Sequence, residues 1–264
     1  MSILQKFSLE NKVVLITGGR QLYGKSSSIA LAQAKATLYI ATHSIEKALP
    51  FIDELNQMGG TAYAIEFDQE NPQSIKRMFE NVISKEGRID VFINASRVKP
   101  GSFGWEQKIS DLEYSIRCNG AAFLYMNRLV GEQMIKQKSG SMILFSSMMG
   151  LVGVESHNYD GAEEMKKGAY SHDYAVVKSG VNGWTRHAAS YYGRYGIRVN
   201  AICPGGLETP DMNPSFVKNY SLHTQLNRMA DNEDIKGIVV FLASDASKYV
   251  TGTIIPVDGG YVGI

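Results

Sequence analysis

Short apolar runs alternate with longer amphipathic segments over most of the chain. Runs rich in Val, Ile, Leu and Phe predict buried strands, and the segments between them carry helical spacing. Strands are predicted at residues 13–17, 38–42, 62–67, 91–94, 141–146, 199–202 and 253–257. Helices are predicted from the loop after residue 17 to about residue 35, over 45–58, 71–86, 174–192 and 232–243, and somewhere between 111 and 138.

This alternation predicts a single α/β domain over residues 1–264, since no repeat, low-complexity segment or Pro/Ser-rich linker divides the chain. Helical crossovers between strands favour a doubly wound parallel sheet of about seven strands, with helices on both faces. Ligands bind beyond the carboxyl ends of the strands in such a sheet. A site is therefore expected among the residues that follow positions 17, 42, 67, 94, 146 and 202.

Composition narrows the class of protein without naming an activity. Apolar residues make up 44% of the chain and the formal net charge is +1, so neither disorder nor a nucleic-acid or membrane partner is indicated. The five His residues show no metal-ligand spacing, so no metal is expected. Cys118 and Cys203 are read as reduced thiols. The first residues lack the pattern of a secretory signal, so a cytoplasmic location is expected.

A glycine loop follows the first predicted strand and leads into a helix. It contains Gly18, Gly19, Arg20, Leu22 and Gly24. A glycine turn at a helix N-terminus presents backbone N–H groups and a positive dipole end to a pyrophosphate. A plain strand-to-helix turn is the alternative, but the position in the first strand–helix–strand unit favours a dinucleotide cofactor.

The end of the second strand bears on the choice of cofactor. An Asp or Glu there would bind the ribose 2′-hydroxyl and repel a 2′-phosphate, whereas this chain has Thr42 and His43. The residues therefore favour NADP(H) slightly over NAD(H). Asp68, after the third strand, is a candidate acceptor for the adenine amino group, with capping of a turn as the alternative.

Tyr174 and Lys178 lie four residues apart on a predicted helix, and so on one face of it. A cation beside a phenol stabilises the phenolate, which allows the phenol to exchange a proton with an alcohol or a carbonyl. Any helix can contain such a pair. Its meaning here comes from Ser146 and Ser147, which end a strand where ligands are expected to bind.

These features together resemble the short-chain dehydrogenase/reductase family over nearly the whole chain. Besides the glycine loop and the Tyr-x-x-x-Lys pair, residues 200–209 (NAICPGGLET) are similar to the family's N-A-x-x-P-G-x-[IV]-x-T. Residues 234–245 and 257–260 are similar to its last helix and strand. The resemblance implies a Rossmann fold and hydride transfer between a nicotinamide cofactor and an alcohol or ketone.

The resemblance also implies roles for single residues. Ser147 resembles the serine that hydrogen-bonds the reacting oxygen, Tyr174 the general acid/base, and Lys178 the lysine that holds the nicotinamide ribose. For cofactor binding, the resemblance assigns Pro204 and Gly205, with Leu207 and Thr209 at the carboxamide and a nearby phosphate, and Asn94 at the adenosine half.

Two departures from the family pattern affect the site. The middle glycine of the loop falls on Leu22, or on Gln21 in the alternative spacing, so a side chain stands where the backbone should approach the pyrophosphate. The fourth catalytic residue, an asparagine, falls on Cys118 by its usual spacing from Phe123, with Asn119 next to it. A one-residue helix bulge would bring Asn119 into place, and we assign Asn119 on that basis.

Residues 153–173 form an unusually long polar segment before Tyr174. Such a segment suits a hydroxylated substrate, and a solvated surface excursion is the alternative. This segment and residues 213–220 resemble family members of flagellin-glycosylation and nonulosonate sugar pathways. A sugar or sugar derivative is therefore the expected substrate class.

Three hypotheses follow. The first is an NAD(P)-dependent oxidoreductase acting on a secondary alcohol or ketone. The second is a catalytically impaired protein of the same fold that binds a nucleotide or sugar and acts through partners. The third, an enoyl-thioester reductase, is disfavoured because that group spaces its tyrosine and lysine farther apart, and Ser171 stands seven residues before Lys178. The family resemblance implies a homo-oligomer, a dimer or a homotetramer.

Overall fold

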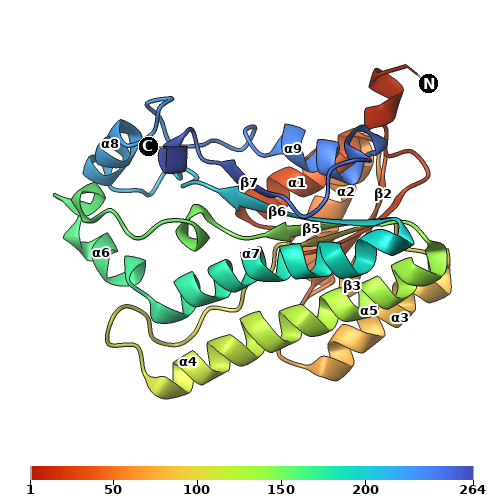
Figure 1. Ribbon diagram of the computed structural model, residues 1–264, viewed down its shortest axis with the longest axis horizontal. Helices are drawn as coiled ribbons and strands as arrows, with labels where there is room; N and C mark the ends of the chain where they lie inside the picture. The colour runs from red at the N-terminus through yellow and green to blue at the C-terminus, as the bar shows by residue number, and fades with distance from the viewer. Residues whose placement is uncertain (1, 264) are drawn as a thin grey trace.

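A parallel sheet of seven strands forms the centre of the protein in the computed structural model, which describes residues 2–263. The strand order is β3-β2-β1-β4-β5-β6-β7 (Figure 1). All of the paired neighbours are parallel. The strands are β1 (Val13–Thr17), β2 (Thr37–Thr42), β3 (Thr61–Glu66), β4 (Val91–Asn94), β5 (Gly140–Phe145), β6 (Ile197–Pro204) and β7 (Ile254–Val257).

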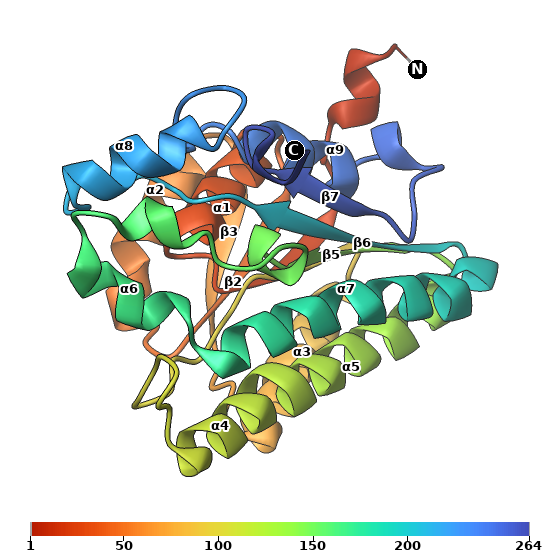
Figure 2. The ribbon, with the colours of Figure 1, turned by 60° about the vertical axis from the view of Figure 1, so that its left-hand side comes forward.

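Helices cover both faces of this sheet (Figures 1 and 2). One face packs against α3 (Pro72–Glu86), α5 (Ala122–Gln137) and α7 (His172–Tyr192), and the other against α1 (Leu22–Gln33), α2 (Leu49–Gln57) and α9 (Lys236–Ala243). Each face has its own hydrophobic core. The predicted doubly wound Rossmann fold is therefore confirmed.

The strand order reverses at β1, because β2 and β4 lie on either side of it. A parallel sheet opens a crevice at such a point, beyond the carboxyl ends of the strands. Strand β1 is buried along its whole length, as its unbroken apolar run predicts for a sheet covered on both faces. This buried strand delivers the glycine loop to the crevice.

The predicted strands agree with the structure to within two residues at each end. Two helices start later than predicted. Residues 46–48 form a separate 3₁₀ turn, and α2 begins at Leu49 with Pro50 in its first turn, where proline is tolerated. The predicted helix 232–243 begins only at Lys236, because Asp234 pairs with Arg228 and accepts from the Asp231 N–H.

Two helices were not predicted: α6 (Glu163–Ala169) and α8 (Pro214–Leu222). They lie side by side beyond the sheet in both views (Figures 1 and 2). The amide of Asn219 donates to the Asp160 carbonyl at 2.9 Å, and that of Asn213 donates to Glu164 Oε1 at 2.8 Å. Ala162, Phe216 and Tyr220 are buried in a small core of their own. Residues 153–173 are thus a packed part of the fold rather than a solvated excursion.

The long helix predicted between residues 111 and 138 is interrupted where a bulge was predicted. It consists of α4 (Ile109–Ser115), a π-helical turn (Ile116–Ala121) and α5. The helix bulge is therefore confirmed. Cys118 and Cys203 are both buried free thiols. Within the described chain, no helix has the length and apolarity needed to cross a membrane.

Candidate active site

A cavity of about 610 Å³ runs along the carboxyl ends of β1, β2, β4, β5 and β6, and we call it the cofactor cavity. Five basic side chains line it, and no Asp or Glu of the described residues does. The basic residues are Arg20, Lys47, Arg97, Lys99 and Lys178. A cavity lined by one sign of charge concentrates ligands of the opposite sign. Its chemistry therefore suits a ligand with several negative charges.

The glycine loop forms one wall of the cofactor cavity. Gly18 has φ +74°, and a Cβ there would lie 2.6 Å from the Ala95 backbone. A Cβ on Gly24 would lie 2.0 Å from the Gly18 carbonyl oxygen. Both positions therefore exclude any side chain. This close backbone packing at the start of α1 is the cradle that a pyrophosphate requires.

Leu22 occupies the place of the missing glycine and keeps the backbone conformation that a glycine would adopt. Its φ is +46°, a left-handed value that is strained for a branched residue, and its side chain is 62% exposed. Leu22 and Gln21 both line the cofactor cavity. The loop thus carries an exposed apolar side chain at the rim of the cavity.

The end of β2 lines the cavity next to the glycine loop, through Thr42, His43 and Ser44. Arg20 Nη1 donates to Thr42 Oγ1 at 2.9 Å, and Nη2 donates to the Lys47 carbonyl at 2.6 Å. Both acceptors are neutral, so the charge of Arg20 is not compensated by them. Arg20, Lys47 and His43 therefore give this end of the cavity a basic lining.

The two residues assigned to the adenosine half of a cofactor, Asp68 and Asn94, do not line the cavity. Asp68 Oδ1 accepts from the Glu70 N–H at 2.9 Å, so Asp68 caps a turn, and its neighbour Gln69 lines the wall instead. Asn94 is buried, and its Oδ1 accepts from Thr17 Oγ1 at 3.2 Å. Asn94 therefore holds β1 and β4 together beneath the cavity. A contact of either side chain with a cofactor stays a prediction.

Tyr174 and Lys178 lie on one face of α7 and both line the cavity. Lys178 Nζ donates to the Phe145 carbonyl at 2.7 Å and lies 5.8 Å from the centre of the Tyr174 ring. Burial, helped by the nearby cation of Arg97, lowers the pKa of Lys178 to about 8. The ammonium is therefore still charged at pH 7, although burial has removed most of the water that would solvate this charge.

Ser146 and Ser147 follow β5 and have different surroundings. Ser146 Oγ donates to the Lys178 carbonyl at 2.8 Å, which ties β5 to α7. Ser147 Oγ accepts from the Met149 N–H at 3.2 Å, so its own hydroxyl proton is free to point elsewhere. Both line the cavity beside Tyr174. Of the two, Ser147 has the hydroxyl available to a ligand oxygen.

Asn119 lies behind the cavity wall, where the π-helical turn places it. Its amide group donates to the Val98 carbonyl at 2.8 Å and to Ser115 Oγ at 3.0 Å, and its Oδ1 accepts from the Val98 N–H at 2.8 Å. The neighbouring Cys118 side chain is buried elsewhere. Asn119 therefore anchors the segment after β4, which forms the cavity wall around Arg97.

Arg97 was not predicted from the sequence. Its guanidinium carbon lies 4.6 Å from the centre of the Tyr174 ring, and Nη2 lies 3.5 Å from Asp173 Oδ2. Asp173 is buried, and the same oxygen accepts from Ser115 Oγ at 2.6 Å. A chain of polar contacts thus runs from Asn119 through Ser115 and Asp173 to Arg97. Lys47, Lys99 and Gln69 were likewise not singled out from the sequence.

Comparison with known proteins shows the family to which the chain belongs. The family model described as enoyl-(acyl carrier protein) reductase matches residues 24–262. A 3-oxoacyl-(acyl-carrier-protein) reductase of Thermotoga maritima is 32% identical over 257 residues, which cover 96% of this chain and 99% of that protein. The chain belongs to the short-chain dehydrogenase/reductase family.

Two further relatives of this dehydrogenase/reductase show how wide the family is. An L-rhamnose 1-dehydrogenase (NAD(P)(+)) of Sphingomonas sp. strain SKA58 is 30% identical over 259 residues, 96% of each chain. The solved structure of a 7α-hydroxysteroid dehydrogenase with NADH and 7-oxo glycochenodeoxycholic acid has a TM-score of 0.85 and 26% identity, with 98% of each chain covered. This chain is accordingly an NAD(P)-dependent oxidoreductase that acts on CH–OH groups.

Residues 200–209, which include the end of β6, line the cofactor cavity of this dehydrogenase/reductase only in part. Pro204 and Gly205 line it. Leu207 is buried and forms a β-bridge with Ala230, and Thr209 Oγ1 donates to Asp211 Oδ1 at 2.6 Å. The predicted contacts of Leu207 and Thr209 with a cofactor therefore stay predictions.

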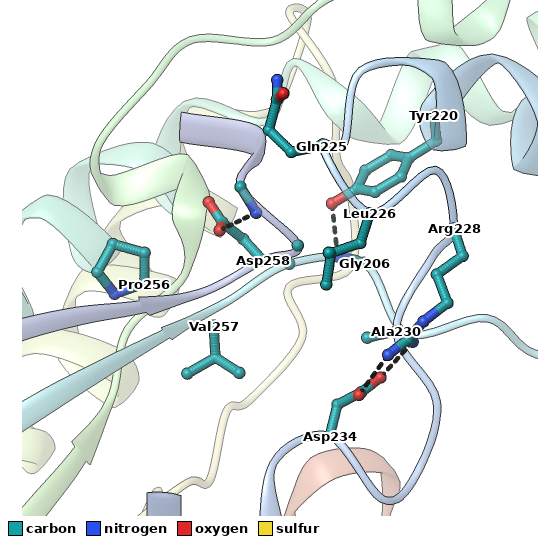
Figure 3. A pocket seen from close by; sticks show the side chains of 13 residues that line it. Gly206, Tyr220, Gln225, Leu226, Arg228, Ala230, Asp234, Pro256, Val257 and Asp258 are labelled. Carbon is teal, nitrogen blue, oxygen red and sulfur yellow. Dashed lines mark hydrogen bonds and ion pairs between the residues drawn. The ribbon is translucent and has the colours of Figure 1, made fainter. Parts of the chain in front are cut away.

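A second cavity of about 410 Å³ lies on the other side of Gly205, and we call it the C-terminal cavity (Figure 3). Arg228 pairs with both carboxylate oxygens of Asp234 at 2.6 Å. Asp258 accepts from the Gly260 N–H at 3.0 Å and from the Val262 N–H at 2.9 Å. The Tyr220 hydroxyl accepts from the Gly206 N–H at 2.6 Å. The charged side chains drawn around this cavity, Arg228, Asp234 and Asp258, thus all have partners within the protein.

Proposed function

We propose that this dehydrogenase/reductase uses NADP(H) in preference to NAD(H) and interconverts a secondary alcohol and a ketone on a sugar or sugar derivative. The observation that supports it most is the convergence of Ser147, Tyr174 and Lys178 on one wall of the basic cavity. Those side chains come from the turn after β5 and from α7, and the glycine cradle lies on the same cavity. Proton transfer and cofactor binding therefore share one space.

The residues divide the reaction between them. The nicotinamide cofactor supplies or accepts the hydride when bound. Tyr174 is the general acid/base, which gives its phenolic proton to a carbonyl oxygen or takes one from an alcohol. Ser147 donates a hydrogen bond to the same oxygen, and Lys178 binds the ribose hydroxyls and stabilises the phenolate. Asn119 is a positioning residue, because it reaches the site only through the wall that it anchors.

The proposed preference for NADP(H) rests on charge at the end of β2. Arg20, Lys47 and His43 line the cavity there, and no described carboxylate does. An Asp or Glu at this point would repel a 2′-phosphate, whereas the guanidinium of Arg20 would bind one.

The proposed sugar class rests on the packed segment 153–173, which leads directly into α7, and on α8, which packs against that segment. Asn158 is buried, its Nδ2 donates to the Tyr261 hydroxyl at 2.8 Å, and its Oδ1 has no partner among the described residues. A buried amide oxygen without a partner can accept a hydrogen bond from a polar ligand, which suits a hydroxylated substrate. The name of the rhamnose dehydrogenase agrees with this class.

Replacing Tyr174 by Phe tests the proposal directly. Tyr174→Phe removes the exchangeable proton and should lower kcat roughly 10²- to 10⁴-fold while leaving NADPH binding unchanged. Turnover is followed by NADPH absorbance with a panel of sugar ketones and alcohols, and binding by NADPH fluorescence. Tyr63→Phe on the exposed face of β3 is the matched control and should behave as wild type. Unchanged turnover in Tyr174→Phe refutes the assignment.

A second function, nucleotide or sugar binding without catalysis, is favoured by the strained Leu22 at the pyrophosphate cradle. The same titration separates the two functions. Failure to bind either NADPH or NADH at millimolar concentration supports the second function and opposes the first.

The proposal includes self-association into a dimer or tetramer. The expected surfaces are residues 123–137, 181–192 and 250–264. Leu124 and Tyr191 on two of these surfaces are large side chains left nearly half exposed. Such apolar side chains on long helices are suited to pairing with a second copy of the chain.

A further inference from the structure

The cofactor cavity holds more positive charge than the proposed cofactor accounts for. Arg20 and Lys47 serve the end near β2, and Lys178 serves the ribose. Arg97 and Lys99 remain, and both line the cavity at the segment after β4. These two cations lack a ligand in the proposed reaction, and Arg97 lies against the ring of the catalytic tyrosine.

Arg97 is held in place and yet leaves most of its donors unused. Its single hydrogen bond among the described residues is the long one of 3.5 Å from Nη2 to Asp173. The guanidinium lies 4.6 Å from the Tyr174 ring centre, and its side chain is 30% exposed. A guanidinium carries five N–H donors in a rigid fork. A fork that is fixed on one side and open on the other matches a carboxylate geometrically.

The rigidity of Arg97 comes from groups behind the wall. Asp173 is held by the Ser115 hydroxyl at 2.6 Å, and its other oxygen, Oδ1, is buried with no partner among the described residues. Ser115 in turn accepts from Asn119 at 3.0 Å. Because these groups are buried, Arg97 is preorganised before any ligand arrives, which lowers the entropy lost on binding.

We propose that Arg97, assisted by Lys99, binds a carboxylate group of the substrate, so that the substrate is a hydroxy acid or its oxo acid. Arg97 and Lys99 carry two positive charges and Asp173 carries one negative charge. The net charge of one matches a monoanion better than a phosphate dianion. The inference rests on the proposed function, because it requires the carboxylate to lie close to the alcohol or ketone group with which Tyr174 exchanges a proton.

A competing role for Arg97 is to hold the Tyr174 ring by stacking alone. The two roles differ in one respect. A stacking residue affects every substrate equally, whereas a carboxylate-binding residue affects acids and leaves their neutral analogues unchanged.

The test measures carboxylate binding without turnover. NADPH-saturated protein is titrated with gluconate and with tartrate, which cannot be reduced further by NADPH at their alcohol groups, and the thermal shift is followed. Glucitol and threitol are the uncharged partners with the same hydroxylated chains. We expect a dose-dependent stabilisation by at least one carboxylate and a much smaller shift with its uncharged partner.

Arg97→Ala should raise the apparent Kd of the carboxylate about 10- to 100-fold and leave the response to the uncharged partner within twofold. Arg77→Ala, which removes an exposed arginine on α3 away from the cavity, is the matched control and should behave as wild type. Equal shifts with acids and uncharged partners in wild type overturn the inference, and so does an Arg97→Ala protein that binds the carboxylate as wild type does.

Turnover measured in parallel separates this inference from the proposed function. Oxo acids and their methyl esters are compared as substrates, and Arg97→Ala should raise KM for the acid alone. Carboxylate binding without any NADPH oxidation would overturn the proposed function and keep the carboxylate site. Reduction of neutral ketones without a preference for acids would keep the proposed function and overturn the inference.

Discussion

The cofactor cavity and the C-terminal cavity share Gly205 as a wall and differ in how their charges are arranged. In the C-terminal cavity, Arg228 is matched by Asp234, and Asp258 by two backbone N–H groups. In the cofactor cavity, Arg20 contacts neutral oxygens, and no described carboxylate lines the wall. The two cavities thus differ in charge balance: the C-terminal cavity pairs its charges internally, whereas the cofactor cavity leaves positive charge for a ligand.

The two cavities should also contribute to stability with opposite signs. A paired charge at a partly exposed site adds a little to the free energy of unfolding. A cation brought out of water without a counter-charge lowers that free energy. Substitutions of the arginines and the lysine in these cavities therefore test the comparison.

The largest contrast is expected between the two arginines. Arg20→Ala should weaken NADPH binding roughly 10- to 100-fold, since a charge-assisted hydrogen bond to phosphate is lost, and should affect NADH binding less. Arg228→Ala should leave the affinity for both cofactors within twofold. It should instead lower the free energy of unfolding slightly, because Asp234 loses its partner in an ion pair that is open to solvent. Fluorescence titration and thermal denaturation measure the two effects.

The Arg228 effect should depend on pH in a defined direction. The Arg228 guanidinium lowers the pKa of Asp234, so the pair stabilises the fold above the ordinary pKa of an aspartate and ceases to do so as that carboxylate is protonated. A loss of NADPH affinity in Arg228→Ala equal to that in Arg20→Ala would remove the distinction between the cavities.

The next effect concerns Lys178, whose charge is poorly solvated. Lys178→Met should raise the free energy of unfolding by about 1 kcal/mol at pH 7 even though it abolishes activity. The pKa of Lys178 is about 8 in the folded chain, below the ordinary value of 10.5. The penalty is therefore full below pH 8 and fades as the pH rises toward 10.5, where the unfolded chain also releases the proton. Thermal denaturation at pH 7 and pH 10 should show the gain shrinking, and a constant gain would contradict the assigned cause.

The smallest effect concerns backbone strain at the rim of the cofactor cavity. Leu22→Gly and Lys138→Gly both replace a side chain at positive φ, +46° and +53° respectively, and each should stabilise the fold by up to about 1 kcal/mol. Lys138 ends α5 far from the cavity, so it is the matched control. Only Leu22→Gly should tighten NADPH binding, by roughly threefold to tenfold, because the backbone could then approach the pyrophosphate. Equal NADPH affinity in both variants would show that the side chain at the rim is harmless.

The pattern of apolar residues along the chain predicted the buried strands well, because each of these strands is determined by its own short sequence. The unbroken apolar runs located β1 and β4 to the residue, because strands buried on both faces admit little else. The family spacing around Phe123 pointed to a one-residue bulge in this helix, and the structure has a π-helical turn there. By contrast, α6 and α8 were missed, because their polar surfaces hide a small core that forms only when the two segments meet.

In the site, too, some residues could be predicted from their local sequence and others could not. Tyr174 and Lys178 could be paired from the sequence because a helix sets their separation. Arg97 could not be found in this way, since its contact with Asp173 joins residues 76 positions apart and depends on how α7 packs against the segment after β4. Asp68 was assigned to the adenine from its place after a strand, but the turn directs its carboxylate to the Glu70 N–H. Strand ends predict where a site lies, and tertiary packing selects the side chains that enter it.

The π-helical turn at Ile116–Ala121 has a consequence for comparing this chain with its relatives. A column-by-column alignment without a gap sets Cys118 opposite the family's asparagine and would record a lost catalytic residue. In the structure, the widened turn brings Asn119 to the Val98 backbone. Searches that infer inactive enzymes from missing residues should therefore consider both Cys118 and Asn119 at this turn.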